Sequence, residues 1–187
     1  MLIEKIEQGH YYHIYNRGNN GQNIFLEDLN YNYFLQLIIK YLVPDFQIFS
    51  YCLLPNHFHI LLRVKEECKL PSQQFSNLFN AYTKAMNKKY NRTGSLLEKP
   101  FKRINISNEE YLKTLVLYIH LNPEKHEISK DFSIYKYSSY QSIISQGKTN
   151  IPREEVIDWF GDLLNFKEAH KQKKKLLNIE NAKLFLE

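Results

Sequence analysis

Cysteine and long apolar segments are both scarce in this sequence. Its 187 residues include only two cysteines, Cys52 and Cys68, which cannot form the disulfide framework of a small secreted protein. Cys52 falls in a strand-like pattern, so we expect a buried free thiol and a cytoplasmic location. No run of about 18 apolar residues occurs, so we expect no transmembrane helix. The first ten residues carry charges where a secretory signal would be apolar, and we expect no signal peptide.

Internal repeats and low-complexity segments are also absent. Hydrophobic residues make up 43% of the chain and charged residues 24%, the composition of an ordinary soluble globular protein. The length suits one domain with a core plus an appendage, and we place the division between residues 1–148 and 149–187. The net charge of +5 indicates a mild preference for anionic partners.

Hydrophobic periodicity predicts an α+β fold. Strands are expected over residues 11–17, 46–54 and 97–106, with a further strand beginning at His57, and helices over residues 27–43 and 72–90. The order strand, helix, strand, strand, helix, strand is the ferredoxin-like βαββαβ pattern. It predicts an antiparallel sheet with these helices on one face.

The strand that begins at His57 alternates in character. Successive side chains of a strand point to opposite faces, so His57 and His59 share one face while Phe58 and Ile60 face a core. Two imidazoles at this spacing lie about 7 Å apart at their backbones and can converge on one divalent cation. From spacing alone, two solvated histidines are an equal alternative.

A further helix is expected from Glu110 to Pro123. Leucine, valine and isoleucine recur in it at helical spacing and predict a core-facing stripe. Asn108 or its neighbour Ser107 can cap the start, and Pro123 should end the helix or lie just past it.

Tyr118 and Asn122 lie one turn apart on this helix and flank the apolar stripe. A tyrosine hydroxyl is a possible nucleophile, and an amide oxygen is a possible ligand for a hard cation. The chain has 14 tyrosines, so amphipathic packing is the competing explanation for any one of them.

Histidine, a hydrophobic residue and histidine on a strand, followed by Tyr-x-x-x-Asn-Pro on a helix, resembles the single-tyrosine HUH transposases. These are the insertion-sequence-200-like enzymes and the REP-associated tyrosine transposases. Further blocks agree in order, so that the resemblance spans residues 10 to about 145. The matching blocks are residues 12–20, 50–59, 94–103, 118–123 and 135–140.

The sequence departs from the family pattern in two of these blocks. Glu98, Lys99 and Pro100 stand where the family usually has Gln-x-Arg, and Tyr137 stands where it usually has Trp. We expect neither departure to touch a residue with a chemical role, although both could alter DNA contacts.

The resemblance implies a metal-dependent transposase that cleaves and rejoins single-stranded DNA at hairpin-flanked sites. Tyr118 would be the nucleophile and form a 5′-phosphotyrosine intermediate. His57, His59 and Asn122 would bind the metal. Two imidazoles and one oxygen do not select zinc strongly; the resemblance implies Mg²⁺ or Mn²⁺, and Mn²⁺ suits imidazole better.

Basic residues between positions 83 and 103, together with one arginine in the first turn, predict contacts to DNA phosphates. A solvated helix face is the alternative for those on the helix. The predicted contacts are Arg17, Lys84, Lys88, Lys89, Arg92, Lys102 and Arg103. A lysine patch between residues 167 and 175 could hold hairpin DNA or be a solvated helix face.

The remaining histidines are expected to lie outside a metal site. His13 could support a metal ligand or be exposed, and His120 points away from Tyr118 on the same helix. His10, His126 and His170 are expected at the surface.

Two alternative functions stay open. One is a domesticated, host-retained relative that binds hairpin DNA or RNA without transposing. The other is a replication or relaxase-type nickase, which the single tyrosine before Asn-Pro and the small size disfavour. The site could be completed within one chain or by exchange of the tyrosine helix in a homodimer.

Overall fold

The computed structural model describes the backbone of residues 5–184 and the side chains of residues 5–176. Its sheet has the strand order β2-β3-β1-β4, and neighbouring strands are antiparallel. The strands are β1 (Tyr11–Arg17), β2 (Phe46–Leu54), β3 (His57–Val64) and β4 (Lys102–Ile106). The helices are α1 (Asp28–Tyr41), α2 (Pro71–Lys89), α3 (Glu109–Lys125), α4 (Tyr140–Ile144), α5 (Arg153–Asp158) and α6 (Leu163–Leu184), with single 3-10 turns η1 (Asn19–Gly21) and η2 (Phe132–Ile134).

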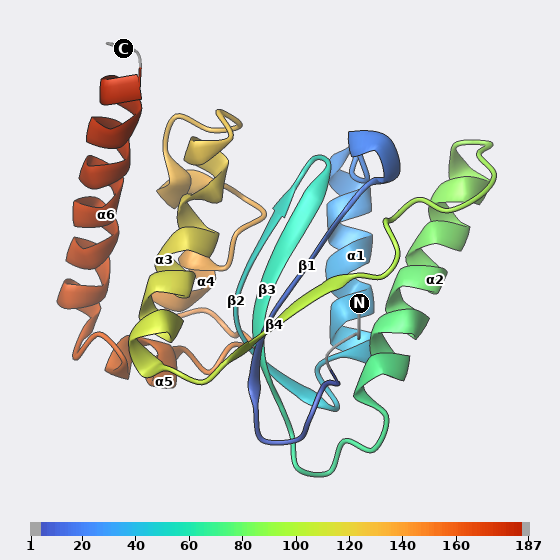
Figure 1. Ribbon diagram of the computed structural model, residues 1–187, viewed down its shortest axis with the longest axis horizontal. Helices are drawn as coiled ribbons and strands as arrows, with labels where there is room; N and C mark the ends of the chain where they lie inside the picture. The colour runs from blue at the N-terminus through green and yellow to red at the C-terminus, as the bar shows by residue number, and fades with distance from the viewer. Residues whose placement is uncertain (1–4, 185–187) are drawn as a thin grey trace.

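The sheet lies between two layers of helices (Figure 1). Helices α1 and α2 cover one face over a core that includes Phe34, Phe58 and Tyr82. Helix α3 covers the other face over a second core that includes Leu61 and Ile119. The expected α+β fold is confirmed, and the tyrosine helix crosses to the histidine face of the sheet within the same chain.

Both faces of β3 are buried, so apolar residues occur at both alternating positions of the strand and not on one face alone. Phe58, Ile60 and Leu62 enter the first core, while Leu61 enters the second. The interpretation of His57 and His59 as two solvated histidines is therefore wrong for His59, which lies under α3 with only 6% of its surface exposed, whereas His57 is partly exposed.

Strand β4 is shorter than expected. It begins at Lys102 instead of Leu97, and Leu97 makes only an isolated bridge to Gly18. Pro100 lies between these positions and lacks the N–H that a ladder hydrogen bond requires, so regular pairing with β1 starts after it.

Helix α3 runs past Pro123 to Lys125, two residues further than the proline predicted. The ring lies in the last turn, where it removes one helical donor. In that turn the Asn122 Nδ2 donates to the Tyr118 carbonyl at 2.7 Å. At the other end Asn108 caps the helix by accepting from the Glu110 N–H at 2.8 Å, as expected.

Helices α5 and α6 pack on the α3 side of the sheet, where Val156 and Phe166 join the second core. His170 of α6 is fully buried, so its expected surface position is wrong. Its Nε2 lies 2.9 Å from Nδ1 of His120, and its Nδ1 donates to the Phe166 carbonyl at 2.7 Å. Among the described residues, none of the helices combines the length and hydropathy needed to cross a bilayer.

Candidate functional site

The two histidines of β3 lie side by side beneath α3. Their ring centroids are 5.2 Å apart and the rings are nearly perpendicular, at 89°. His59 is buried and His57 is partly exposed. The alternation of β3 places both on one face, as expected, and the α3 layer then closes over His59.

Each of these imidazoles is held through its Nδ1 atom. His57 Nδ1 lies 2.6 Å from the Asn56 Oδ1, and because that oxygen can only accept, the imidazole donates. His59 Nδ1 lies 2.9 Å from Nε2 of His13. Both contacts leave Nε2 available for another partner, which is the orientation that neighbouring residues commonly impose on metal-binding histidines.

His13 was expected either to support a ligand or to be exposed, and the structure decides between them. The residue is buried on β1, where it pairs with Leu61 of β3 and lies diagonally across from His59. Its ring stacks on His59 with centroids 5.1 Å apart. Its contact with His59 Nδ1 therefore makes it a positioning residue.

Helix α3 brings Tyr118 to the same place. The Tyr118 ring centroid lies 5.4 Å from that of His59 and 6.3 Å from that of His13. The Lys125 Nζ lies 4.9 Å from the centroid of the tyrosine ring. The tyrosine and both β3 histidines thus meet within one chain.

Asn122 lies behind Tyr118 and is fully buried. Its Nδ2 donates to the Tyr118 carbonyl, while its Oδ1 has no hydrogen-bond partner among the described residues. An unsatisfied buried oxygen costs free energy, so this acceptor suits a cation or another donor. It is not one of the residues lining the cavity in front of the histidines.

A cavity of about 510 Å³ opens in front of these side chains. Tyr118, His57 and His59 line it together with residues from β1, the β2–β3 turn and the segment before β4. His126 also lines it, with its ring centroid 4.7 Å from that of His57. His126 is exposed, as expected, and the end of α3 turns its ring toward β3, so that this surface residue also belongs to the cavity. Its sequence position, three residues past an interrupting proline, held no signal for this.

Two of the predicted DNA contacts, Arg17 and Lys102, lie at this cavity. Glu98 lies there too, and its Oε1 is 2.5 Å from the Nε of Arg17. Glu98 thus contacts a predicted DNA contact, in line with the expectation that this departure could alter DNA contacts. Tyr137, the other departure, is buried in the first core and stacks on Tyr31 at 3.8 Å.

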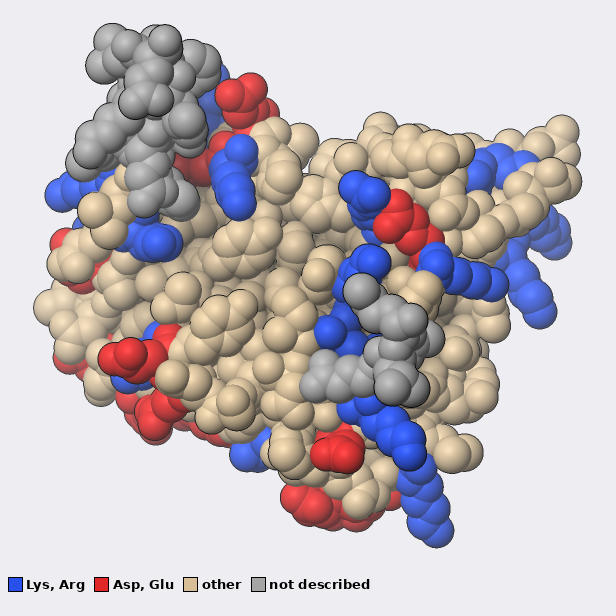
Figure 2. Space-filling view, viewed as in Figure 1, with Lys and Arg blue, Asp and Glu red and all other residues tan. Residues whose placement is uncertain are grey.

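The other predicted DNA contacts lie elsewhere. Lys84 and Lys88 are exposed on α2, on the opposite side of the sheet. Lys89 pairs with Glu27, and Arg92 donates to Gln22 at 2.8 Å. Arg103 lines a second cavity beside α2. Figure 2 shows lysines and arginines gathered over the part of the face that carries β4 and α2.

Burial keeps the site histidines neutral. The pKa of His13 is lowered to about 4 by burial; the pKa of His57, about 4, and that of His59, about 2, are lowered first by burial and second by neighbouring cationic groups. Neutral imidazoles are the form that binds metals. Burial raises the pKa of Tyr118, and a hydrogen bond from Asn122 opposes that rise.

The donor set is suited to a hard or borderline divalent cation with open coordination positions. Within the described part of the chain, no three His, Cys, Asp or Glu side chains gather as a metal-ligand cluster. A cation here would use the Nε2 atoms of His57 and His59 and complete its shell with oxygen from solvent or substrate, since the predicted ligand Asn122 does not line the cavity. Such a mixed N and O shell fits Mn²⁺ or Mg²⁺ better than a thiolate-seeking metal.

Among solved structures, the chain is similar to a REP-associated tyrosine transposase bound to a REP hairpin. The TM-score is 0.67 with 20% sequence identity, covering 79% of this chain and 86% of the other. This likeness shows a shared fold, in agreement with the resemblance in the sequence blocks. A candidate transposase from Deinococcus radiodurans R1 also matches, with a TM-score of 0.43, 11% identity and coverage of 62% and 93%. No protein-family model and no curated protein matches the sequence.

Proposed function

We propose that this protein is a transposase that cleaves and rejoins single-stranded DNA at hairpin-flanked sites, with Tyr118 as the nucleophile. The observation that carries the proposal is the meeting of the Tyr118 ring with His59, with 5.4 Å between ring centroids, at a cavity formed by one chain. The hairpin-bound protein with which it shares its fold supports the choice of substrate.

In the proposed reaction, the Tyr118 Oη attacks the phosphorus of the scissile phosphodiester. A bond forms between phosphorus and Oη as the bond to the 3′ oxygen breaks. The phenolic proton passes to water in the cavity, and the 3′ oxygen takes up a proton and leaves as a 3′-hydroxyl. The covalent 5′-phosphotyrosine conserves the phosphodiester energy, so a 3′-hydroxyl from another end can reverse the step and join the strands.

His57 and His59 would hold a divalent cation through their free Nε2 atoms. Such a cation supplies Lewis-acid polarisation of the phosphate and orients it. Asn56 and His13 keep the two imidazoles in the required tautomer by engaging their Nδ1 atoms. Tyr118 is half-buried, which limits the rotation of its ring, and it lines the cavity.

Arg17 and Lys102 would bind DNA phosphates at the mouth of the cavity. Both side chains are exposed, so they can reach a backbone lying across β1 and β4. Phosphate contacts of this kind set the position of the strand without reading its sequence. Asn122 would act behind the tyrosine, through the hydrogen bond that opposes the rise in its pKa.

The test is formation of a covalent protein–DNA adduct on a denaturing gel. Wild-type protein, Tyr118→Phe and Tyr111→Phe are mixed with single-stranded oligonucleotides from the sequence flanking the gene, in Mn²⁺, Mg²⁺ or chelator. Tyr111 is a matched control because it lies on the same helix and is exposed. The expected result is a metal-dependent adduct that Tyr118→Phe abolishes and Tyr111→Phe retains.

An adduct that survives Tyr118→Phe would contradict the assigned nucleophile. Absence of any adduct, combined with tight hairpin binding that persists in chelator, would instead identify a domesticated binding protein. Size-exclusion chromatography of the active sample would show whether a homodimer accompanies the one-chain site.

A further inference from the structure

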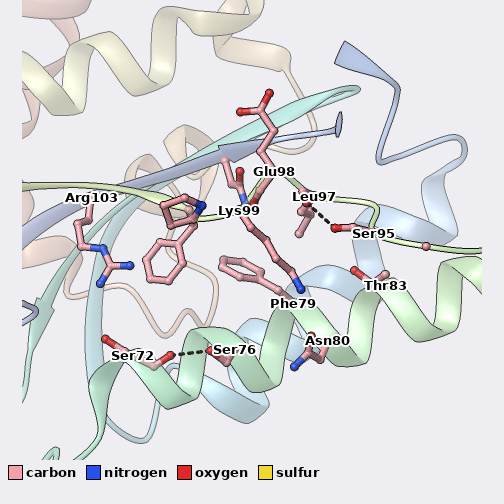
Figure 3. A pocket seen from close by; sticks show the side chains of 14 residues that line it. Ser72, Ser76, Phe79, Asn80, Thr83, Ser95, Leu97, Glu98, Lys99 and Arg103 are labelled. Atoms are coloured by element: carbon pink, nitrogen blue, oxygen red, sulfur yellow. Dashed lines mark hydrogen bonds between the residues drawn. The ribbon is translucent and has the colours of Figure 1, made fainter. Parts of the chain in front are cut away.

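A second cavity, of about 510 Å³, lies on the α2 side of the segment that leads into β4. The cleavage step proposed above makes no use of it. Helix α2 forms one wall and residues 94–103 form much of the other (Figure 3). The volume falls in the range of pockets that hold small organic molecules, and the lining side chains are of three chemical kinds.

The first kind is aromatic. The rings of Phe79 and Phe101 face the cavity with centroids 5.5 Å apart and an interplanar angle of 68°. The Arg103 guanidinium lies 4.0 Å from the centroid of the Phe101 ring. Aromatic rings and guanidinium planes are the surfaces on which unpaired nucleobases stack.

The second kind is polar and neutral. Ser76, Asn80 and Thr83 follow one face of α2 at helical spacing. The Ser76 hydroxyl donates a hydrogen bond to the Ser72 carbonyl at 3.1 Å (Figure 3). The side chains of Asn80 and Thr83 make no hydrogen bond to any described residue. An amide and a hydroxyl together offer both donors and acceptors to the edge of a base.

The third kind is charged. Lys99 extends from the segment before β4 in the direction of α2, whereas the Glu98 carboxylate points away from the cavity (Figure 3). That carboxylate pairs with Arg17 on the other side. Lys99 and Arg103 therefore give this cavity a positive lining, which favours a planar ligand that carries negative charge.

The second cavity adjoins the tyrosine cavity. Asn16 and Glu98 line both, and the Asn16 Nδ2 donates to the Glu98 carbonyl at 3.0 Å. Strand β4 is the edge strand of the sheet, so a flexible strand can pass around this edge from one cavity to the other.

We infer that the α2 cavity binds an unstacked base of the same DNA strand whose scissile phosphate lies at Tyr118. The base lies against Phe101, its polar edge meets Asn80 and Thr83, and the adjoining phosphate meets Lys99. This inference rests on the proposed function for its ligand, because it requires single-stranded DNA at the first cavity. The protein would thereby bind a nucleotide that is distant from the cleaved bond.

The test compares DNA with and without bases. Fluorescein-labelled single-stranded dodecamers of thymidine, of adenosine and of abasic sites are titrated with protein at low salt, and fluorescence anisotropy gives each affinity. The proteins are wild type, Phe101→Leu, Asn80→Ala and Asn77→Ala. Phe101→Leu keeps an apolar side chain against Phe75 but removes the stacking face, and Asn77 is a control of the same residue type on α2 outside the cavity.

We expect wild type and Asn77→Ala to bind at least one base-bearing dodecamer about tenfold more tightly than the abasic one, which is the scale of a single stacked base. Phe101→Leu and Asn80→Ala should lower the ratio of base-bearing to abasic affinity several-fold while leaving the affinity for the abasic strand unchanged. A wild-type ratio near one, or a ratio that Phe101→Leu does not change, would overturn the inference.

Tyr118→Phe separates this inference from the proposed function. If Tyr118→Phe keeps the base-dependent ratio while wild type forms no adduct, the base site stands and the cleavage proposal fails. If the adduct forms but the ratio is insensitive to Phe101→Leu and Asn80→Ala, cleavage stands and the base site fails.

Discussion

Arg17 and Glu98 form an ion pair at the mouth of the tyrosine cavity, with 2.5 Å between Nε and Oε1. The arginine belongs to the end of β1, and the glutamate to the segment before β4. Glu98 is one of the positions at which this chain departs from the family pattern. The pair places a carboxylate at the point where we propose that a phosphate binds, and it occupies the guanidinium that would bind it.

Glu98→Gln should therefore tighten binding of single-stranded DNA. The change removes a negative charge from the cavity and releases Arg17, while the amide keeps the size of the side chain. Since exposed ion pairs contribute at most about 1 kcal/mol, we expect an increase in affinity of up to about fivefold. Anisotropy titrations at two salt concentrations measure it, with Glu67→Gln, an exposed residue outside the cavity, as the control. Equal or weaker binding by Glu98→Gln would show that the carboxylate does not oppose DNA.

His13→Gln should weaken metal binding without removing a proposed ligand. His13 contacts Nδ1 of His59 at 2.9 Å, so its loss frees the imidazole to rotate or change tautomer. Substitution of such supporting residues lowers metal affinity by about 10- to 100-fold. Electron paramagnetic resonance of free Mn²⁺ during a titration reports the affinity independently of DNA cleavage. His10→Gln, at an exposed histidine, should bind Mn²⁺ as wild type does, and equal affinities for all three proteins would remove His13 from the site.

Stability should fall as the pH drops from about 6.5 toward 4. His170 is buried and hydrogen-bonded to His120, and burial lowers its pKa from 6.5 to about 4. Between these values the unfolded chain binds a proton that the folded chain does not, so folding loses free energy as the pH falls through this window. The loss from His170 alone is at most about 3 kcal/mol. Thermal unfolding followed by circular dichroism from pH 7.5 to 4 measures it, and a constant Tm down to pH 4.5 would contradict the prediction.

Phe166→Ala should destabilise the whole protein instead of releasing α6 alone. Phe166 is fully buried in the second core, against α3 and Tyr140. Truncating a buried phenylalanine costs about 3–5 kcal/mol. Leu164→Ala, on the same helix but 75% exposed, should change stability little. Urea unfolding measured both by far-UV circular dichroism and by fluorescence of Trp159, which packs on this core, tests the prediction. Two separate transitions in Phe166→Ala would show that α6 unfolds independently.

Local patterns in the sequence were enough to predict much of the architecture. Alternation in β3, helical spacing in α1, α2 and α3, and proline at the breaks predicted the element order and most boundaries. These signals are local because strand and helix periods follow from backbone geometry. The predicted boundaries were wrong near two prolines. Pro100 precedes β4, which is shorter than predicted, and Pro123 lies within the last turn of α3, which is longer than predicted.

The sequence by itself determined that His57 and His59 share a face and that Tyr118 and Asn122 share a helix. Only the tertiary structure decided that α3 lies on that face in the same chain, that His13 holds His59, and that His126 and Glu98 join the cavity. It also buried His170 against His120, where the sequence favoured a surface position. These contacts join residues from different strands and helices, and they depend on how whole layers pack, which no local period encodes.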